Sequence, residues 1–166
     1  MQTVRAPAVA GLFYPADAAE LHAQVRHFLN QVQPSAEPPP KAIIAPHAGY
    51  IYSGPVAASA YARLKAARDT ISRVVLLGPS HRVGFRGIAV SGMTAFATPI
   101  GRIVVAQEAV EQVRQLPDVG FLEQAHAQEH SLEVHLPFLQ EVLGEFELVP
   151  LVVGDARPQQ VGLVLE

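Results

Sequence analysis

The chain has 166 residues, of which 49% are apolar and 16% charged, and its formal net charge is −3. This composition excludes an intrinsically disordered chain, and the small negative charge gives no electrostatic basis for binding nucleic acid or an anionic membrane. No cysteine is present, so these residues form no disulfide, thiolate metal site or cysteine nucleophile. The first residues lack the apolar run of a signal peptide and no stretch reaches the length of a membrane span, so we expect a cytoplasmic protein.

The first predicted element is a helix that begins after an irregular segment. Asp17 is a suitable N-cap, and the helix is expected to reach about Val32. Leu21, Val25 and Leu29 recur at helical spacing and predict one buried face.

A proline-rich connector over residues 34–40 follows this helix. The next run, Lys41–Ala45, is apolar and typical of a short buried strand. After a loop marked by glycine and proline, Pro55 suits the first turn of a helix that ends at about Ala67.

The clearest strand is Arg73–Leu77, because its continuous β-branched and apolar sequence is typical of a sheet covered on both faces. Further strands are expected at Ile88–Val90, Ile103–Val105 and Phe146–Val153, the last weakened by Pro150. Further helices are expected at Gln107–Leu116, at Glu129–Leu143 with a kink at Pro137, and from Arg157 onward.

Strands that alternate with helices predict a single α/β domain over residues 1–166, with a mostly parallel or mixed central sheet flanked by helices. No partner strand follows the last predicted helix, so we expect the fold to continue beyond residue 166. Ligands of such sheets bind where loops leave the carboxyl ends of strands. His47 follows the Ile43–Ile44 strand and His81 follows the Val74–Leu77 strand, so both are candidate site residues.

Two other chemistries must be weighed against a site built from these histidines. Ser80 precedes His81, but neighbouring side chains on an extended chain point apart and the nucleophile elbow G-x-S-x-G is absent, which disfavours a serine hydrolase. Residues His126–His130 match the H-x-x-E-H pattern of zinc peptidases. The same residues also fit a helix with one polar face, and the pattern leaves His47 and His81 unexplained.

Five segments together resemble the Memo family. Three of them are IIAPHAGYIYSGPVAASAY (43–61), LLGPSHRVGF (76–85) and EHSLEVHLPFL (129–139). The opening AGLFYPAD (10–17) and the late LVPLVVGD (148–155) are similar to family sequence as well. They occur in the family's order along nearly the whole chain.

The resemblance implies a fold like that of the LigB-type, class III extradiol dioxygenases, with a metal at the edge of the sheet. His47 and His81 would be the first two metal ligands. His130 would be a catalytic residue beside them, a neutral imidazole that shuttles protons or orients O2. The residues expected around these groups are Glu129, His135, Tyr50 and Ser80.

The resemblance also implies the cofactor. Related dioxygenases hold non-haem Fe(II) with two histidines and a carboxylate, so Fe(II) is the expected metal, with zinc or copper as alternatives. Family members continue past the position of residue 166. The third ligand is therefore expected outside this sequence, which resembles the amino-terminal part of the family's domain.

Three activities stay open at this point. The first is an iron-dependent, dioxygenase-type oxidoreductase, and the second is a non-catalytic protein that binds metal or peptide in the same cleft. The third is the zinc peptidase. The ligand is accordingly expected to be a small molecule or a peptide. Bacterial and archaeal relatives resemble component B of the AmmeMemoRadiSam system, which implies a radical-SAM protein and an AMMECR1-like protein as partners.

Overall fold

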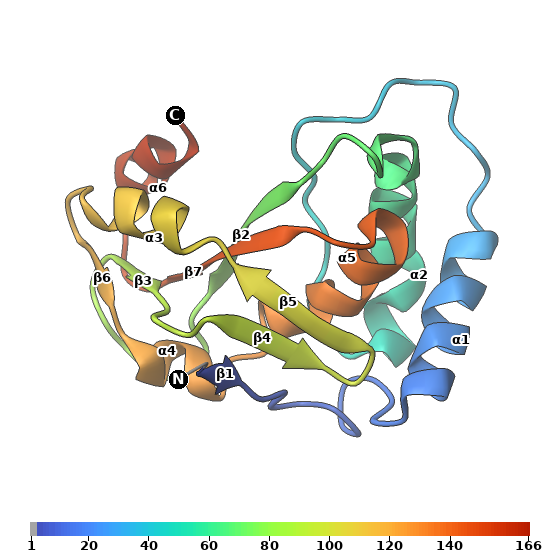
Figure 1. The fold of residues 1–166 in the computed structure, drawn as a ribbon, viewed down its shortest axis with the longest axis horizontal. Coiled ribbons are helices and arrows are strands. Elements are labelled where there is room, and N and C mark those ends of the chain that lie inside the picture. Colours follow the sequence, from blue (N-terminus) through green and yellow to red (C-terminus); the bar gives the residue numbers. More distant parts are fainter. Residues whose placement is uncertain (1–2) are drawn as a thin grey trace.

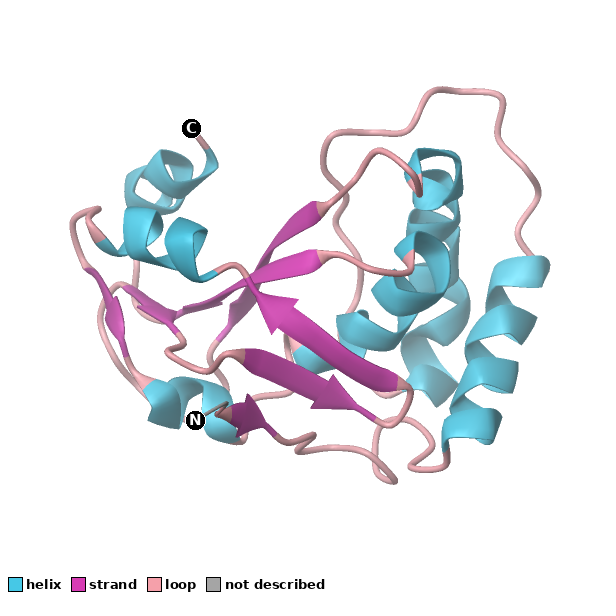
Figure 2. Ribbon diagram, viewed as in Figure 1, coloured by secondary structure: helices cyan, strands magenta, loops and turns pink. Residues whose placement is uncertain are grey.

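A computed structural model describes residues 3–166 as a curled, mixed sheet of seven strands flanked by six α-helices (Figures 1 and 2). The predicted α/β class is therefore confirmed. The strands are β1 (Val4–Arg5), β2 (Arg73–Pro79), β3 (Ile88–Val90), β4 (Ala95–Thr98), β5 (Gly101–Val105), β6 (Val119–Phe121) and β7 (Glu147–Val153). The helices are α1 (Ala18–Asn30), α2 (Tyr50–Tyr61), α3 (Gln107–Arg114), α4 (Glu123–Ala127), α5 (Leu136–Leu143) and α6 (Pro158–Leu165), with the 3-10 helices η1 (Ala62–Ala67) and η2 (Glu133–His135).

Strand β7 organises the sheet, because it pairs with three other strands. One of its edges pairs in parallel with the whole of β2. Its other edge pairs in parallel with β5 at Glu147–Leu148 and antiparallel with β3 at Leu151–Val153. On this second edge, Pro150 lies between the residues of β7 that pair with β5 and those that pair with β3. A residue without a backbone N–H can be accommodated at such a position. This explains how a proline fits into a buried strand.

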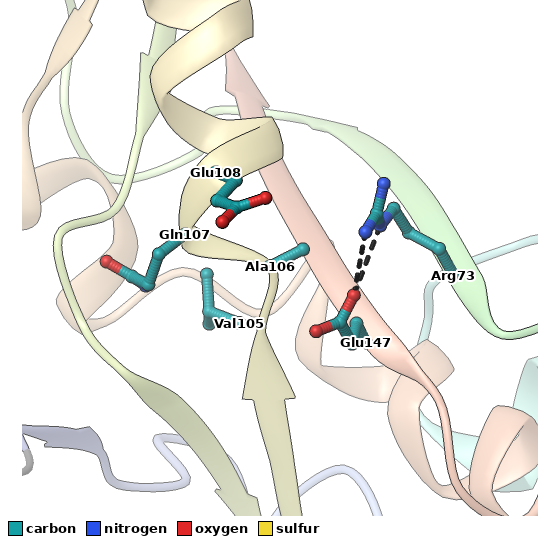
Figure 3. A pocket seen from close by; sticks show the side chains of 6 residues that line it. All are labelled: Arg73, Val105, Ala106, Gln107, Glu108 and Glu147. Carbon is teal, nitrogen blue, oxygen red and sulfur yellow. Dashed lines mark hydrogen bonds and ion pairs between the residues drawn. The ribbon is translucent and has the colours of Figure 1, made fainter.

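An ion pair joins the first residue of β2 to the first residue of β7. Arg73 and Glu147 are direct cross-strand neighbours, and Nε and Nη2 of Arg73 donate to Oε2 of Glu147 at 3.2 and 2.9 Å (Figure 3). The pair lies beside a pocket of about 250 Å³ at the start of α3, which Glu108 also lines. With two carboxylates and one guanidinium, this pocket has no net attraction for an anion.

The first helix agrees with its sequence signals. The carboxylate of Asp17 accepts a hydrogen bond from the Glu20 N–H at 2.9 Å, so the predicted N-cap is confirmed. Leu21, Val25 and Leu29 are buried where α1 packs against α2 and α5 (Figure 1). The helix ends at Asn30, two residues before the predicted end.

The predicted start of the second helix at Pro55 is wrong, because α2 already begins at Tyr50. The Tyr50 N–H donates to the carbonyl of Phe13 at 2.8 Å, and its hydroxyl donates to the carbonyl of Val134 at 2.7 Å. These two long-range contacts fix the first turn five residues earlier than the proline signal. No local sequence pattern encodes them.

The predicted strand Lys41–Ala45 is also wrong. This segment has no regular secondary structure, it pairs with no strand among residues 3–166, and Ile44 is 100% exposed. Strand β2 is present as predicted, yet it is not covered on both faces, since Val75 is 45% exposed. Both segments line the same open groove.

The predicted helix Glu129–Leu143 is divided into shorter pieces. Glu129 and His130 lie in a loop, η2 follows, and α5 begins only at Leu136 with Pro137 in its first turn. The short strands β1, β4 and β6 were not predicted. In the part of the chain that the structure describes, no helix has the length and hydrophobicity to cross a bilayer.

Candidate metal centre

Three histidines from distant parts of the sequence converge at one place. His47 lies in the loop before α2, His81 in the loop after β2 and His130 in the loop before η2. Each offers one ring nitrogen, and the three nitrogens lie within 4.8 Å of one another. The ring centroids are 5.2 Å apart for His47–His81 and 4.6 Å for His81–His130. His47 and His81 therefore meet as predicted, although His47 follows an unpaired segment rather than a strand, and His130 joins them.

Glu129 holds His81 in place through two hydrogen bonds. The His81 ring Nδ1 lies 2.9 Å from Oε1, and the His81 backbone N–H donates to Oε2 at 2.5 Å. Because a carboxylate accepts from Nδ1–H, it favours the tautomer in which Nε2 is a free lone-pair donor. A carboxylate behind an imidazole in this way is the usual support of a metal-ligating histidine.

The Glu129 carboxylate is almost completely buried, with 1% of its side chain exposed. Burial alone would raise its pKa, but donors from His81, and the backbone N–H groups of Ser131 and His130 at 2.9 and 2.8 Å, lower that pKa to about 2. The Glu129 carboxylate therefore stays ionised at neutral pH, directly behind the His81 imidazole.

The other two imidazoles are biased towards their neutral form. Burial lowers the pKa of His47, and the neighbouring His81 lowers it further. Burial also lowers the pKa of His130, against the opposing effect of Glu129. The Nδ1 atom of His130 is buried without a hydrogen-bond partner, and the ring packs on Phe13 at 4.7 Å between centroids. Neutral imidazole is the form that coordinates a metal.

The residues predicted around these histidines have different roles. His135 is buried, its Nδ1 lies 2.8 Å from the Tyr61 hydroxyl, and burial lowers its pKa to about 4. Its ring centroid is 6.3 Å from that of His47, so it borders the site. The Tyr50 hydroxyl donates a hydrogen bond to the backbone carbonyl of Val134. The Ser80 hydroxyl donates to the carbonyl of Val83 at 2.6 Å, a turn contact rather than the position of a nucleophile.

His126 does not belong to this cluster. Its Nε2 lies 3.0 Å from the carbonyl of Ala89 and its ring packs edge-on against Phe96, with 6.0 Å between centroids. Among residues 3–166, the only group of three histidine or acidic side chains close enough to share an ion omits it. The zinc-peptidase alternative needs His126 and His130 on one helix, and the loop at His130 removes that arrangement.

Sequence analysis missed a second carboxylate network directly beside the site. Glu133 is 0% exposed and accepts from the Arg5 guanidinium, from the Tyr14 hydroxyl at 2.5 Å, and from two backbone N–H groups, those of Ala8 at 2.7 Å and Val9 at 2.9 Å. Arg5 also donates to the carbonyl of Glu129 at 2.6 Å. This network anchors the amino-terminal segment that carries Phe13.

The three histidines lie beside a large groove. It has a volume of about 1700 Å³ and extends from His47 and His130 along β2 towards α6. Apolar side chains dominate its walls, among them Ile43, Val74 and Leu139. A polar cluster beside an apolar groove is a common arrangement for binding an organic ligand or a peptide.

Comparison with known proteins shows the family of this chain. The family model described as "Memo-like protein" matches residues 5–164. The chain belongs to the Memo family. Curated relatives named "MEMO1 family protein" include those of Aquifex aeolicus (44% identical over 151 residues), Thermotoga neapolitana (41% over 169) and Ignicoccus hospitalis (39% over 174).

The Memo relatives are longer than this chain. The three alignments cover 90%, 93% and 98% of the chain but only 55%, 60% and 61% of the respective relatives. The chain thus spans little more than half the length of the curated relatives it matches. What the whole Memo protein does is accordingly a matter of proposal.

Proposed function

We propose that this Memo-family chain provides a binding site for one transition-metal ion, held by His47, His81 and His130. The observation that carries the proposal is the convergence of three ring nitrogens within 4.8 Å. The Glu129 carboxylate behind His81 supports it, because it orients the ring and leaves Nε2 available. The site's donors are neutral imidazoles, which suit iron, zinc, copper and nickel and are poor ligands for magnesium or calcium.

Among these metals we propose Fe(II) as the physiological one, in accord with the resemblance to the LigB-type dioxygenases. When bound, Fe(II) would supply a Lewis acid with open positions for substrate and O2. The chain's own groups prepare the site for it. Glu129 keeps its charge and orients His81, and the Phe13 ring packs on His130 and excludes water from one side of that imidazole.

The activity proposed for the whole protein is a dioxygenase-type oxidation of a small molecule. In this proposal His130 is a ligand, because burial favours its neutral form, and the proton-moving role that the resemblance implies for it would pass to another group. The second candidate is a protein that binds metal or peptide without turnover, and the wide apolar groove beside the histidines favours it. Partnership with a radical-SAM protein and an AMMECR1-like protein stays a prediction.

The first test is metal retention by a protein without an affinity tag. The chain is loaded with Fe(II) under anaerobic conditions, desalted and assayed for iron, alongside the double variant His47→Ala/His81→Ala. The matched control is His22→Ala/His27→Ala, which removes two histidines from helix α1, away from the cluster. Wild type and control should retain about one ion per chain, and the site variant should lose it. Equal retention in all three proteins would refute the site.

Oxygen consumption separates the two activities. Iron-loaded protein is screened for O2 uptake with catechol-like substrates. Uptake that is present in wild type and in the His22→Ala/His27→Ala control and is lost with the iron in His47→Ala/His81→Ala supports the oxidoreductase. Stable iron binding without uptake, in this chain and in a relative of full length, supports the binding protein instead.

A further inference from the structure

The loop that follows β2 carries an arginine directly beside a residue of the metal centre. Arg82 is the neighbour of His81 in the sequence, and both residues are exposed at a bend of the chain. Side chains alternate in direction only along an extended strand, so at this bend the two need not point apart. Within residues 3–166, the Arg82 guanidinium takes part in no hydrogen bond or ion pair, in contrast to five other arginines.

The loop that carries Arg82 is held in place on both sides of this residue. The Ser80 N–H donates to the carbonyl of Val153 at 2.8 Å, and the Ser80 hydroxyl donates to the carbonyl of Val83 at 2.6 Å. Further along, the carbonyl of Phe85 accepts a hydrogen bond of 2.8 Å from a backbone N–H in the loop after β7. These contacts confine the backbone at Arg82, so its cation stays beside the histidine cluster although the side chain itself is free.

The charge of Arg82 acts on this cluster. Burial is the main cause that lowers the pKa of His130, and the Arg82 guanidinium is one of the neighbours that lower it further. Arg86 and Arg102 are also exposed, and in the described part of the chain they too have no ion pair. Neither of them contributes to the lowered pKa of His47 or His130. Of these three arginines, Arg82 is therefore the one close to the site.

The buried carboxylate of the site does not neutralise Arg82. Glu129 accepts four hydrogen bonds, one from the ring of His81 and three from backbone N–H groups. A carboxylate has about four lone-pair positions, so these donors take up its capacity. The guanidinium, a planar fork of N–H donors, is left for a ligand.

We propose that Arg82 selects the ligand of this site, and that the ligand is an organic molecule with an oxyanion, a carboxylate or a phosphate, that binds next to His81. This selection rests on the proposed metal centre, because the charge of a bound ion would add to that of Arg82. Arginine holds an oxyanion through two parallel N–H···O bonds, which are stronger than hydrogen bonds between neutral groups. A neutral ligand of the same shape would gain neither contribution.

Benzoate and benzamide are suitable matched probes, because they have nearly the same shape and differ in charge. Their binding is measured by isothermal titration calorimetry at low ionic strength, with the protein metal-free and loaded with Co(II). We expect the loaded wild type to bind benzoate at least about tenfold more tightly than benzamide. Phenyl phosphate, measured in the same way, distinguishes the two oxyanions: tighter binding than benzoate assigns a phosphate, and weaker binding assigns a carboxylate.

The variants isolate the contribution of Arg82. Arg82→Ala should bind benzoate about tenfold more weakly, while its affinity for Co(II) stays at least as high as that of wild type, because only a nearby cation is removed. Arg82→Lys should keep part of the benzoate affinity, because the charge remains and the planar fork is lost. The matched control is Arg102→Ala, which removes an exposed arginine from β5 and should leave both affinities unchanged.

Equal benzoate affinity in wild type and Arg82→Ala would overturn the proposal, as would an equal loss in Arg102→Ala or equally tight binding of benzamide. Failure of the metal centre itself is recognised separately, because the wild type would then bind no Co(II). In that case benzoate binding to the metal-free protein decides the matter. A loss confined to the two Arg82 variants supports the role of this residue, and the absence of any difference from wild type contradicts it.

Discussion

Two glutamates four residues apart, Glu129 and Glu133, are both buried and both accept several hydrogen bonds, yet they have different surroundings. Glu133 faces a guanidinium, a phenol and backbone N–H groups, none of which has a free coordination position. Glu129 contacts Nδ1 of the His81 imidazole, a ring that lies in one cluster with His47 and His130. Burial of a carboxylate therefore does not identify function, whereas the chemistry of its partners does.

The two networks are also connected. Arg5 pairs with the Glu133 carboxylate and donates to the backbone carbonyl of Glu129, so the structural network holds the loop that the site network uses. We expect Glu133 to contribute mainly to stability and Glu129 mainly to metal affinity. The following experiments test that division, beginning with the largest effect.

Glu133→Gln should destabilise the protein by about 3–5 kcal/mol, because it leaves the buried Arg5 cation without its partner charge. Unfolding in urea, measured without metal, gives the free energy. The double variant Arg5→Met/Glu133→Leu should lose less than Glu133→Gln alone, since it removes both charges together. A single variant as stable as wild type would show that the pair is not a structural anchor.

Glu129→Gln should lower metal affinity about 10- to 100-fold, as expected when the carboxylate behind a ligating histidine is lost. The amide keeps the size of the side chain, so the loss of stability should be smaller, about 1–3 kcal/mol. Metal titration and urea unfolding of the same preparation measure both. A variant that loses stability but keeps its metal affinity would place Glu129 in the same class as Glu133.

The pH dependence of stability should reveal Glu129 as well. Hydrogen bonds lower its pKa in the folded protein to about 2, below the ordinary value of 4.5. The unfolded chain therefore takes up the proton first, so the stabilisation from Glu129 is complete above about pH 4.5 and is lost as the pH falls towards 2. The stability gap between wild type and Glu129→Gln should narrow over this range. A gap independent of pH would contradict the lowered pKa.

The smallest effect is expected for an ion pair outside both networks. Glu147→Gln removes the partner of Arg73, but both side chains are about half exposed, so the loss should be at most about 0.5 kcal/mol. Urea unfolding of Glu147→Gln and Glu133→Gln, each against wild type, gives the two losses in free energy of unfolding. A loss as large as that of Glu133→Gln would show that burial does not separate the two pairs.

Sequence patterns predicted the parts of this fold that depend on local chemistry. The Asp17 cap, the α1 stripe and the core of β2 follow from capping and hydrophobic spacing, and the structure confirms them. Patterns failed where distant contacts decide the outcome. The start of α2 is fixed by the Phe13 carbonyl, and the segment Lys41–Ala45 lacks the neighbour that would make it a strand.

At the site, too, local sequence patterns predicted one part and contacts between distant residues decide the rest. The convergence of His47 and His81 was predicted from two strand ends, but in the structure only His81 follows a strand, and His47 reaches it from the loop before α2. The Glu129 contact with His81 could not be derived from spacing, since the chain at Glu129 is a loop rather than the predicted helix. Glu133 carried no signal of its own, as its partners lie about 120 residues away in the amino-terminal segment.

The central claim is that His47, His81 and His130 form one metal centre. Titration with Co(II), followed through its visible absorption, tests it most directly in wild type and in three variants, each with one of these histidines changed to alanine. We expect one Co(II) per wild-type chain and an affinity at least about tenfold lower in every variant. Wild-type affinity in any of the three variants would contradict the claim, because that histidine would then not be a ligand of the ion.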